Sequence, residues 1–321
     1  MKKRTKRWLR YARNAGITLG VLIAVWFIIK SAAPNTNYAI KDKYFHRRSA
    51  DMFGEMRVTD DISVICDLDT EIAHYELSSL MAGEVEGVTY TDALFVLNDR
   101  YYVQNEDILS LLVTKEIDGY GEVTLVGGAH APLAALLAAA EKETASRFTL
   151  GSSYIPSPNA SLDIGDDCYL SAYHDTSEHA WGLGVDLLID GVDTHRYMTH
   201  PLAKWLQDHA WEYGFAVRYP FWEAEWTGVS FQPWHIRYVG EVHAAYMYAH
   251  RLSLEEYLDT VFSDGMYYLW DMTRIDGTKV TYVIFSQRAY EKTVYIPTTL
   301  TDVEISFDNT AQNYYVWGIL K

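Results

Sequence analysis

Three residues of this sequence have the types that a catalytic metal ion needs. His179 and Asp186 lie seven residues apart, and His235 follows in a second motif, Pro-Trp-His. Two imidazoles and one carboxylate leave one coordination position of a zinc ion open, as catalytic zinc sites do. The position three residues before His235, where a hydrolase would place a carboxylate base, holds Gln232. The sequence therefore indicates metal binding more directly than it indicates turnover.

The spacing of His179 and Asp186 limits the backbone conformations that could join them at one ion. An odd offset places two side chains of one regular strand on opposite faces. On an ideal helix they would lie about 10 Å apart along the axis, too far to bind one metal. Gly182 and Gly184 permit a bend or bulge. We therefore expect a strand with a glycine bend, on which Glu178 points away from the metal.

Hydrophobic periodicity and turn residues predict the elements around these residues. Helices are expected over residues 131–145, 202–213 and 242–250, and strands over 93–97, 101–103, 148–154, 183–189, 231–238, 279–285 and 313–317. Helices followed by strands that carry the metal ligands indicate an α+β domain, with a small antiparallel sheet flanked by helices.

Composition and charge exclude some partners. Ten tryptophans and 25 tyrosines indicate that most of the chain packs into a core. The first 30 residues carry eight basic and no acidic residues, which leaves 19 basic against 43 acidic residues in the remainder, a net charge of −24. Nucleic acid is a poor partner for so acidic a surface, so no nucleic-acid binding is expected.

An uncharged apolar segment, residues 15–29, follows the basic N-terminus. It is about 22 Å long as a helix, and a short extension with Lys30 snorkelling covers a ~30 Å hydrocarbon core. We interpret residues 1–34 as a basic cytoplasmic segment and a single-pass membrane anchor. The positive-inside rule then places residues 35–321 outside the cytoplasm. The alternative is a cleaved signal peptide and a secreted protein.

The exported part divides into three predicted regions. Residues 35–88 are polar and irregular and are interpreted as a stalk, residues 89–262 as the metal-binding domain, and residues 263–321 as a β-rich extension that packs against the core. Cys66 and Cys168 both lie in this part. They could form one disulfide or remain free thiols, and the sequence leaves both open.

Several short motifs surround the predicted ligands in the sequence. These are Ser177-Glu178-His179, Gly182, Asp186, Tyr213-Gly214-Phe215, Arg218-Tyr219-Pro220, Thr227-Gly228, Pro233-Trp234-His235, Arg237-Tyr238-Val239-Gly240 and Leu254-Glu255-Glu256-Tyr257-Leu258. In this order and spacing they resemble the VanY-type D-alanyl-D-alanine carboxypeptidases, zinc peptidases that share a fold with lysostaphin and the hedgehog signalling domain. The resemblance is strongest over residues 177–258, weaker back to Ala93, and reaches the β-rich tail over residues 294–317.

The resemblance implies a role for each matching residue. His179, Asp186 and His235 would bind zinc, which would polarise the amide carbonyl and supply the attacking hydroxide. Trp234 and Arg237 flank the last ligand and are expected to brace it. The predicted substrate-binding set consists of Ser177, Arg218, Trp234 and Arg237.

Two positions depart from the family pattern. Gln232 stands where the family has a glutamate, and an amide cannot take a proton from zinc-bound water, a loss of roughly 10²–10⁴ in rate. Ile155 stands where the family has an arginine that binds substrate and stabilises developing charge. Glu223 and Glu225, on an aromatic loop before Gln232, are candidates for a replacement base, although a solvated loop with an aromatic anchor explains them as well.

Three hypotheses follow for the function. The first is a membrane-anchored zinc D,D-carboxypeptidase that removes the terminal D-Ala of peptidoglycan stem peptides. The second is a catalytically impaired pseudoenzyme that keeps the metal and binds cell-wall peptide or a partner protein. The third is a structural ectodomain without metal, which the complete ligand set disfavours.

Overall fold

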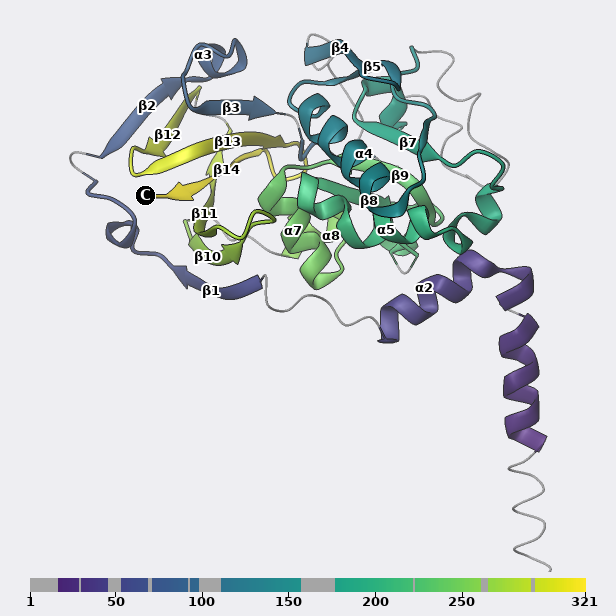
Figure 1. Cartoon of the computed structure of the whole chain (residues 1–321). Helices are drawn as coiled ribbons and strands as arrows, with labels where there is room; N and C mark the ends of the chain where they lie inside the picture. The colour runs from purple at the N-terminus through teal and green to yellow at the C-terminus, as the bar shows by residue number, and fades with distance from the viewer. Residues whose placement is uncertain are drawn as a thin grey trace, which may run out of the picture.

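The structure, a computed structural model, describes residues 17–28, 30–45, 53–68, 71–91, 93–97, 111–156, 177–221, 223–260, 265–289 and 292–321. These residues form a four-stranded sheet of order β6-β7-β9-β8 and a six-stranded sheet of order β1-β10-β11-β14-β13-β3. Two-stranded ribbons, β4-β5 and β12-β2, accompany them. Figure 1 shows the two large sheets side by side, with helices α7 and α8 between them.

The four-stranded sheet is antiparallel throughout and carries the predicted ligands. Its strands are β6 (Thr149–Leu150), β7 (Gly184–Leu188), β9 (Gln232–Tyr238) and β8 (Phe215–Tyr219). Helices α4 (His130–Thr144) and α5 (Pro201–His209) pack on one face, in a core with Val185, Leu187 and Ile236. Because side chains alternate along a strand, Asp186 and His235 lie on the opposite face. This arrangement confirms the predicted mixed α+β fold.

The two helices follow from their sequences. α4 is rich in alanine and leucine and buries Leu133, Leu136, Leu137 and Ala140, at the spacing of one helical face. α5 begins with Pro201 in its first turn, and the 3₁₀ turn η7 (Ala210–Tyr213) continues it to Gly214. Gly214 has φ 76°, a left-handed conformation that glycine adopts without steric cost. Both helices lie where the sequence predicts them.

The six-stranded sheet corrects the prediction of a stalk over residues 35–88. Its central strands come from the C-terminal region: β10 (Tyr267–Thr273), β11 (Lys279–Arg288), β13 (Leu300–Asp308) and β14 (Asn313–Leu320). Its edges come from the N-terminal region, because β1 (Phe53–Thr59) pairs antiparallel with β10 and β3 (Val88–Thr91) pairs parallel with β13. In Figure 1 these blue strands lie beside the yellow C-terminal ones. β1 has an irregularity between Phe53 and Met56 that breaks its alternation, and β3 is only four residues long, so neither gives a strong strand signal.

The helix over residues 34–45 and the described elements between residues 62 and 126 also contact the folded body. The helix α2 (Pro34–Phe45) packs on the 3₁₀ turn η6 (Thr194–Thr199), where Asn35 donates to the carbonyl of Thr194 and accepts from the amide of Met198. A second group comprises η1 (Ile62–Val64), β2 (Ile72–Glu76), α3 (Leu77–Met81), β4 (Leu112–Ile117) and β5 (Gly121–Val126). β2 pairs with β12 (Thr293–Pro297), which again joins the N-terminal and C-terminal parts.

The strand predicted over residues 93–97 is wrong. Leu94 and Val96 are fully buried, but their backbone groups bond to side chains instead of a partner strand. The amide of Leu94 donates to the Ser306 hydroxyl at 2.8 Å, and the amide of Val96 donates to the Asn309 side chain at 2.7 Å. The strand predicted over residues 101–103 lies outside the described residues.

The predicted membrane anchor and the possible disulfide both involve some residues outside the described ranges. Residues 17–28 are helical, expose apolar side chains such as Leu22 and Phe27, and extend away from the two sheets in Figure 1. No helix within the described ranges has both the length and the apolar character to span a membrane. Residues 1–16 and Ile29, which belong to the predicted anchor, lie outside those ranges. So does Cys168, whereas Cys66 is buried.

The six-stranded sheet packs on α7 (Glu241–His250) and α8 (Leu254–Thr260) through one shared apolar core. That core combines Val239, Val242, Met247, Leu254 and Tyr257 with Tyr268, Trp270, Tyr282, Ile284 and Trp317. Beside it, Glu304 of β13 is buried and accepts from the hydroxyls of Tyr238 at 3.3 Å and Thr91 at 3.5 Å. Desolvation by burial outweighs these hydrogen bonds and raises the pKa of Glu304 to about 7.

The raised pKa of Glu304 predicts a stability that falls as pH rises. Between its usual pKa and about 7 the folded protein holds a proton that the unfolded chain has released, so the stabilisation present at low pH is lost as pH rises through 7. Glu304→Gln mimics the protonated carboxyl. Between pH 5 and pH 8 the variant should gain about 3 kcal/mol in free energy of unfolding relative to the native protein. Urea unfolding at both pH values measures this difference, and an equal difference at both would contradict it.

Candidate metal centre

His179 and Asp186 come together through a tight turn and a left-handed glycine. His179 lies in the 3₁₀ turn η5 (Glu178–Trp181), which ends at Gly182 with φ 64°. The amide of Leu183 donates back to the carbonyl of Glu178 at 3.0 Å, and β7 then begins at Gly184. The glycine bend that the spacing predicts is therefore present. The expectation that His179 lies in a strand is wrong, because the turn is 3₁₀.

Strand pairing brings His235 to the same point. β7 and β9 run antiparallel, with Asp186 directly opposite His235. The Nδ1 of His235 lies 2.7 Å from Oδ1 of Asp186, and the Nε2 of His179 lies 3.4 Å from Oδ2 of Asp186. One ligand atom from each residue lies within 4.8 Å of the others. The structure thus brings the three predicted ligands together.

The remaining ring atoms of both histidines contact protein groups. The Nδ1 of His179 lies 2.9 Å from the carbonyl of Ser153, so it donates and leaves Nε2 facing Asp186. The Nε2 of His235 lies 3.2 Å from Oε2 of Glu178, and the ring of Tyr219 stacks on His235 at 5.1 Å. These contacts fix the orientation of both rings, as the outer contacts of metal-bound histidines do.

The electrostatics of the cluster favour a positive charge at its centre. Burial disfavours the Asp186 carboxylate, but His179 and His235 outweigh it and hold the pKa of Asp186 well below its usual range. Burial also disfavours protonated His235, yet its hydrogen bonds to Asp186 and Glu178 raise the pKa of His235 to about 9. A divalent cation would displace that proton and take the same place. The three side chains offer suitable donor atoms, and these atoms lie close enough together to bind one divalent metal ion.

Two arginines behind the ligands are engaged with carboxylates. Arg218 and Arg237 have no exposed surface. The Nε of Arg218 donates to Glu178 at 2.6 Å, and its two terminal nitrogens donate to Glu255 of α8 at 2.8 and 2.7 Å. Arg237 donates to Glu178 at 2.7 Å. The prediction that these arginines bind substrate is therefore corrected, because both are buried as supports of the ligand-bearing turn and strand.

The other two predicted substrate-binding residues, Ser177 and Trp234, lie in different environments. Ser177 is buried directly before η5, next to the ligand turn. Trp234 lies on the opposite face of the sheet from His235 and meets Tyr197 edge to face at 5.9 Å. This position suits the bracing of β9 and not contact with a substrate.

Both departures from the family pattern adjoin the elements that carry the ligands. Gln232 begins β9, opposite Tyr219 of β8, and is partly buried. Ile155 donates its amide to the carbonyl of His179 at 2.9 Å, and its side chain packs on the apolar cluster around Trp181. The backbone at residue 155 thus supports a ligand, while its side chain brings no charge.

The candidate replacement bases do not join the ligand group. Glu225 is exposed on the short helix α6 (Ala224–Thr227), whereas Glu223 is buried at the start of that helix. Neither carboxylate belongs to the cluster of His179, Asp186 and His235.

Sequence reasoning missed Glu178 and Glu255. The expectation that Glu178 points away from the metal assumes an extended chain, and the 3₁₀ turn redirects it beneath His235. The signal for Glu178 was its charge directly beside the ligand His179 in the sequence. Glu255 gave none, because its contact to Arg218 spans 37 residues and two elements.

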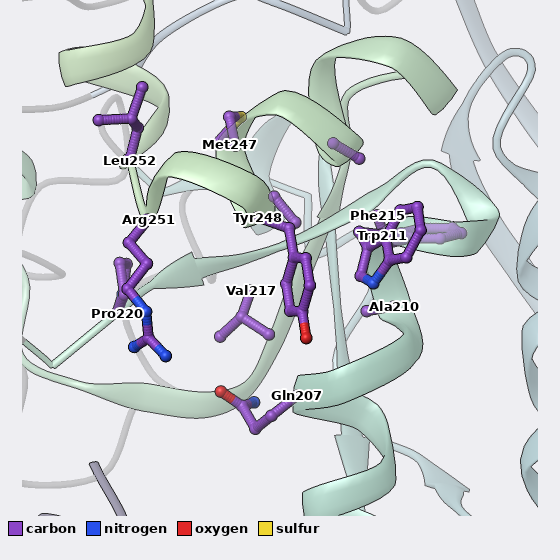
Figure 2. Close-up of a pocket in the computed structure, with 12 residues that line it drawn as sticks. Gln207, Ala210, Trp211, Phe215, Val217, Pro220, Met247, Tyr248, Arg251 and Leu252 are labelled. Atoms are coloured by element: carbon purple, nitrogen blue, oxygen red, sulfur yellow. The ribbon is translucent and has the colours of Figure 1, made fainter. Parts of the chain in front are cut away.

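A separate pocket lies beside β8, away from this chemistry. Its cavity volume is about 80 Å³, and it opens between α5 with η7 on one side and α7 on the other. Figure 2 shows Trp211, Tyr248 and Arg251 around it. None of the three candidate ligands lines it.

Comparisons with known proteins identify the family. The sequence model of the VanY family, described as D-alanyl-D-alanine carboxypeptidase, matches residues 165–241. The chain is 31% identical over 237 residues to the D-alanyl-D-alanine carboxypeptidase of Enterococcus faecium, covering 70% of this chain and 74% of that protein. A second relative of the same description, from Enterococcus faecalis, is 45% identical over 85 residues, which is 26% of this chain and 31% of that protein. The chain therefore belongs to the VanY-type D-alanyl-D-alanine carboxypeptidase family.

A solved structure supports the fold. The vancomycin resistance D,D-dipeptidase VanXYg, in complex with a D-Ala-D-Ala phosphinate analogue, aligns with 84% of this chain and 100% of its own. The TM-score is 0.59 and the sequence identity 20%. At that identity the likeness concerns the fold alone.

Zinc should stabilise the native protein by mass action. A ligand that binds only the folded state at 100 times its Kd raises the free energy of unfolding by about 2.7 kcal/mol. His235→Ala should abolish this gain, whereas His195→Ala, at an exposed histidine, should keep it. Thermal unfolding with zinc and after chelation measures both. An equal zinc response in His235→Ala would place the metal elsewhere.

Proposed function

We propose that this protein is a zinc-dependent D,D-carboxypeptidase-like protein that acts on the D-alanyl-D-alanine end of peptidoglycan stem peptides. The observation that carries the proposal is the convergence of His179, Asp186 and His235 at one point, in a chain of the VanY-type family. The relatives in that family are described as D-alanyl-D-alanine carboxypeptidases. Convergent ligands of this kind also disfavour a purely structural ectodomain.

The residues of this chain divide the work at the site. Zinc, when bound, would polarise the peptide carbonyl and lower the pKa of a coordinated water. His179, Asp186 and His235 would hold it, and the carbonyl of Ser153 accepts a hydrogen bond from the ring of His179. Burial of all three ligands to below one-fifth exposure excludes most water and strengthens the electrostatic interactions at the site.

Proton transfer is the step for which this chain is less well equipped. Gln232 can donate and accept hydrogen bonds at the position of the family's glutamate, but its amide cannot act as a base near neutral pH. Ile155 brings a side chain without charge to the position of the family's arginine. These two residues favour the second candidate function, a metal-retaining pseudoenzyme that binds cell-wall peptide or a partner protein.

The site of action proposed for either function is outside the cytoplasm. The basic N-terminus, the exposed apolar side chains of residues 17–28 and the acidity of the remaining chain support this location. Digestion of intact cells with an added protease checks it, since a cytoplasmic protein would stay uncut.

Restoring the base should decide between the two functions. Zinc-loaded native protein and Gln232→Glu are incubated with a pentapeptide that ends in D-Ala-D-Ala, and released D-alanine is measured. We expect the variant to release D-alanine roughly 10²–10⁴ times faster, because it regains a general base. Gln312→Glu, at an exposed position, is the matched control and should not change the rate.

Each outcome of this assay has a distinct meaning. No release by the native protein, with release restored in Gln232→Glu, establishes the pseudoenzyme. Equal release by both forms shows that another group acts as the base. If neither zinc-loaded form releases D-alanine or binds the peptide, the proposed function is wrong.

A further inference from the structure

Glu178 is a fully buried carboxylate whose two oxygens have different partners. Oε1 accepts from Nε of Arg218 at 2.6 Å and from Nη1 of Arg237 at 2.7 Å. Oε2 lies 3.2 Å from Nε2 of His235. Because two guanidinium donors already occupy Oε1, the second oxygen is available for the imidazole N–H.

We infer that Glu178 is a positioning residue for the metal, which holds His235 by its Nε2–H so that Nδ1 faces the ion. The inference rests on the metal binding in the proposed function. It goes beyond the ligand set, because it names the group that fixes the tautomer and the ring orientation of His235. Carboxylates that accept the second N–H of a ligand histidine fix its tautomer and its ring orientation.

The backbone leaves room for this contact at one glycine. A Cβ placed on Gly184 would lie 2.5 Å from Nε2 of His235 and 3.2 Å from Oε2 of Glu178. Any larger residue would therefore enter the space through which the two groups meet. The need for glycine at this position is spatial, since the residue has no positive φ.

The chain also fixes Glu178 from behind. Arg218 donates two parallel hydrogen bonds to the carboxylate of Glu255 on α8. Arg237 donates its Nη2 to the carbonyl of Phe95 at 2.8 Å, in the segment that leads in from the six-stranded sheet. Arg218, Arg237, Glu178 and Glu255 thus form a buried array whose two positive and two negative charges balance. Within it, Glu178 contacts both arginines and also His235.

The position of Glu178 in the chain, directly before the ligand His179, suits this role. A carboxylate one residue before His179 belongs to the same 3₁₀ turn, so one turn presents a ligand and the group that orients the ligand on the neighbouring strand. The separation of Asp186 and Glu178 on opposite ring nitrogens of His235 then leaves Nδ1 on the side of the candidate metal.

Zinc affinity and the His235 tautomer test this role directly. The full-length native protein, Glu178→Gln and Gly184→Ala are titrated with zinc against a chromophoric chelator. We expect both variants to bind zinc about 10–100-fold more weakly, the usual effect of losing an outer contact of a ligand. Glu304→Gln, at a buried glutamate outside the array, is the matched control and should keep the native Kd within about twofold.

Nitrogen-15 NMR of the histidine rings supplies a second readout that needs no variant. In the zinc-loaded native protein, His235 should carry its proton on Nε2 and coordinate through Nδ1. This readout uses the native protein, so it gives an answer even if Glu178→Gln does not fold.

The outcomes separate this inference from the proposed function. Coordination of zinc through Nε2 of His235, or native zinc affinity in a folded Glu178→Gln, would overturn the positioning role and leave the proposed function standing. Failure of the native protein to bind zinc at all would overturn both.

Discussion

The antiparallel pairing of β7 with β9 is the constraint on which the site depends. It places Asp186 directly opposite His235, although 49 residues separate them in the chain. The adjacent 3₁₀ turn then adds His179 from the side. A slip of one residue in this register would move His235 to the opposite face of the sheet, where α4 and α5 form the core. The candidate metal site and the fold therefore depend on one set of backbone hydrogen bonds.

The same sheet separates two environments that the site requires. One face is apolar and packs on α4 and α5, which keeps the strands in register. The other carries the candidate ligands, with Arg218, Arg237, Glu178 and Glu255 buried behind them. Buried charges are tolerated only when they are paired and hydrogen-bonded, and here each guanidinium meets a carboxylate. Hydrogen bonds are directional, so these buried charged groups restrict the orientation of the ligand imidazoles more strictly than apolar packing would.

Much of the fold was open to prediction where the sequence signal is local. The helix over α4, the helix that ends at Gly214, and the strands that became β7 and β9 follow from periodicity and from turn residues. The sequence did not predict that the region called a stalk joins a sheet, because β1 is largely exposed and irregular and β3 is only four residues long. Residues 93–97 mimic a buried strand in composition, but Ser306 and Asn309 satisfy their backbone groups.

The sequence by itself determined which residues could bind a metal, because residue type and spacing around His179, Asp186 and His235 carry that chemistry. It also determined the family and the substitution of Gln232 for the expected base. Only the tertiary structure decided that the arginines are buried supports and that Glu178 turns beneath His235. The physical reason is that solvent access and hydrogen-bond partners depend on elements distant in the chain, such as α8, whose contacts no local pattern encodes.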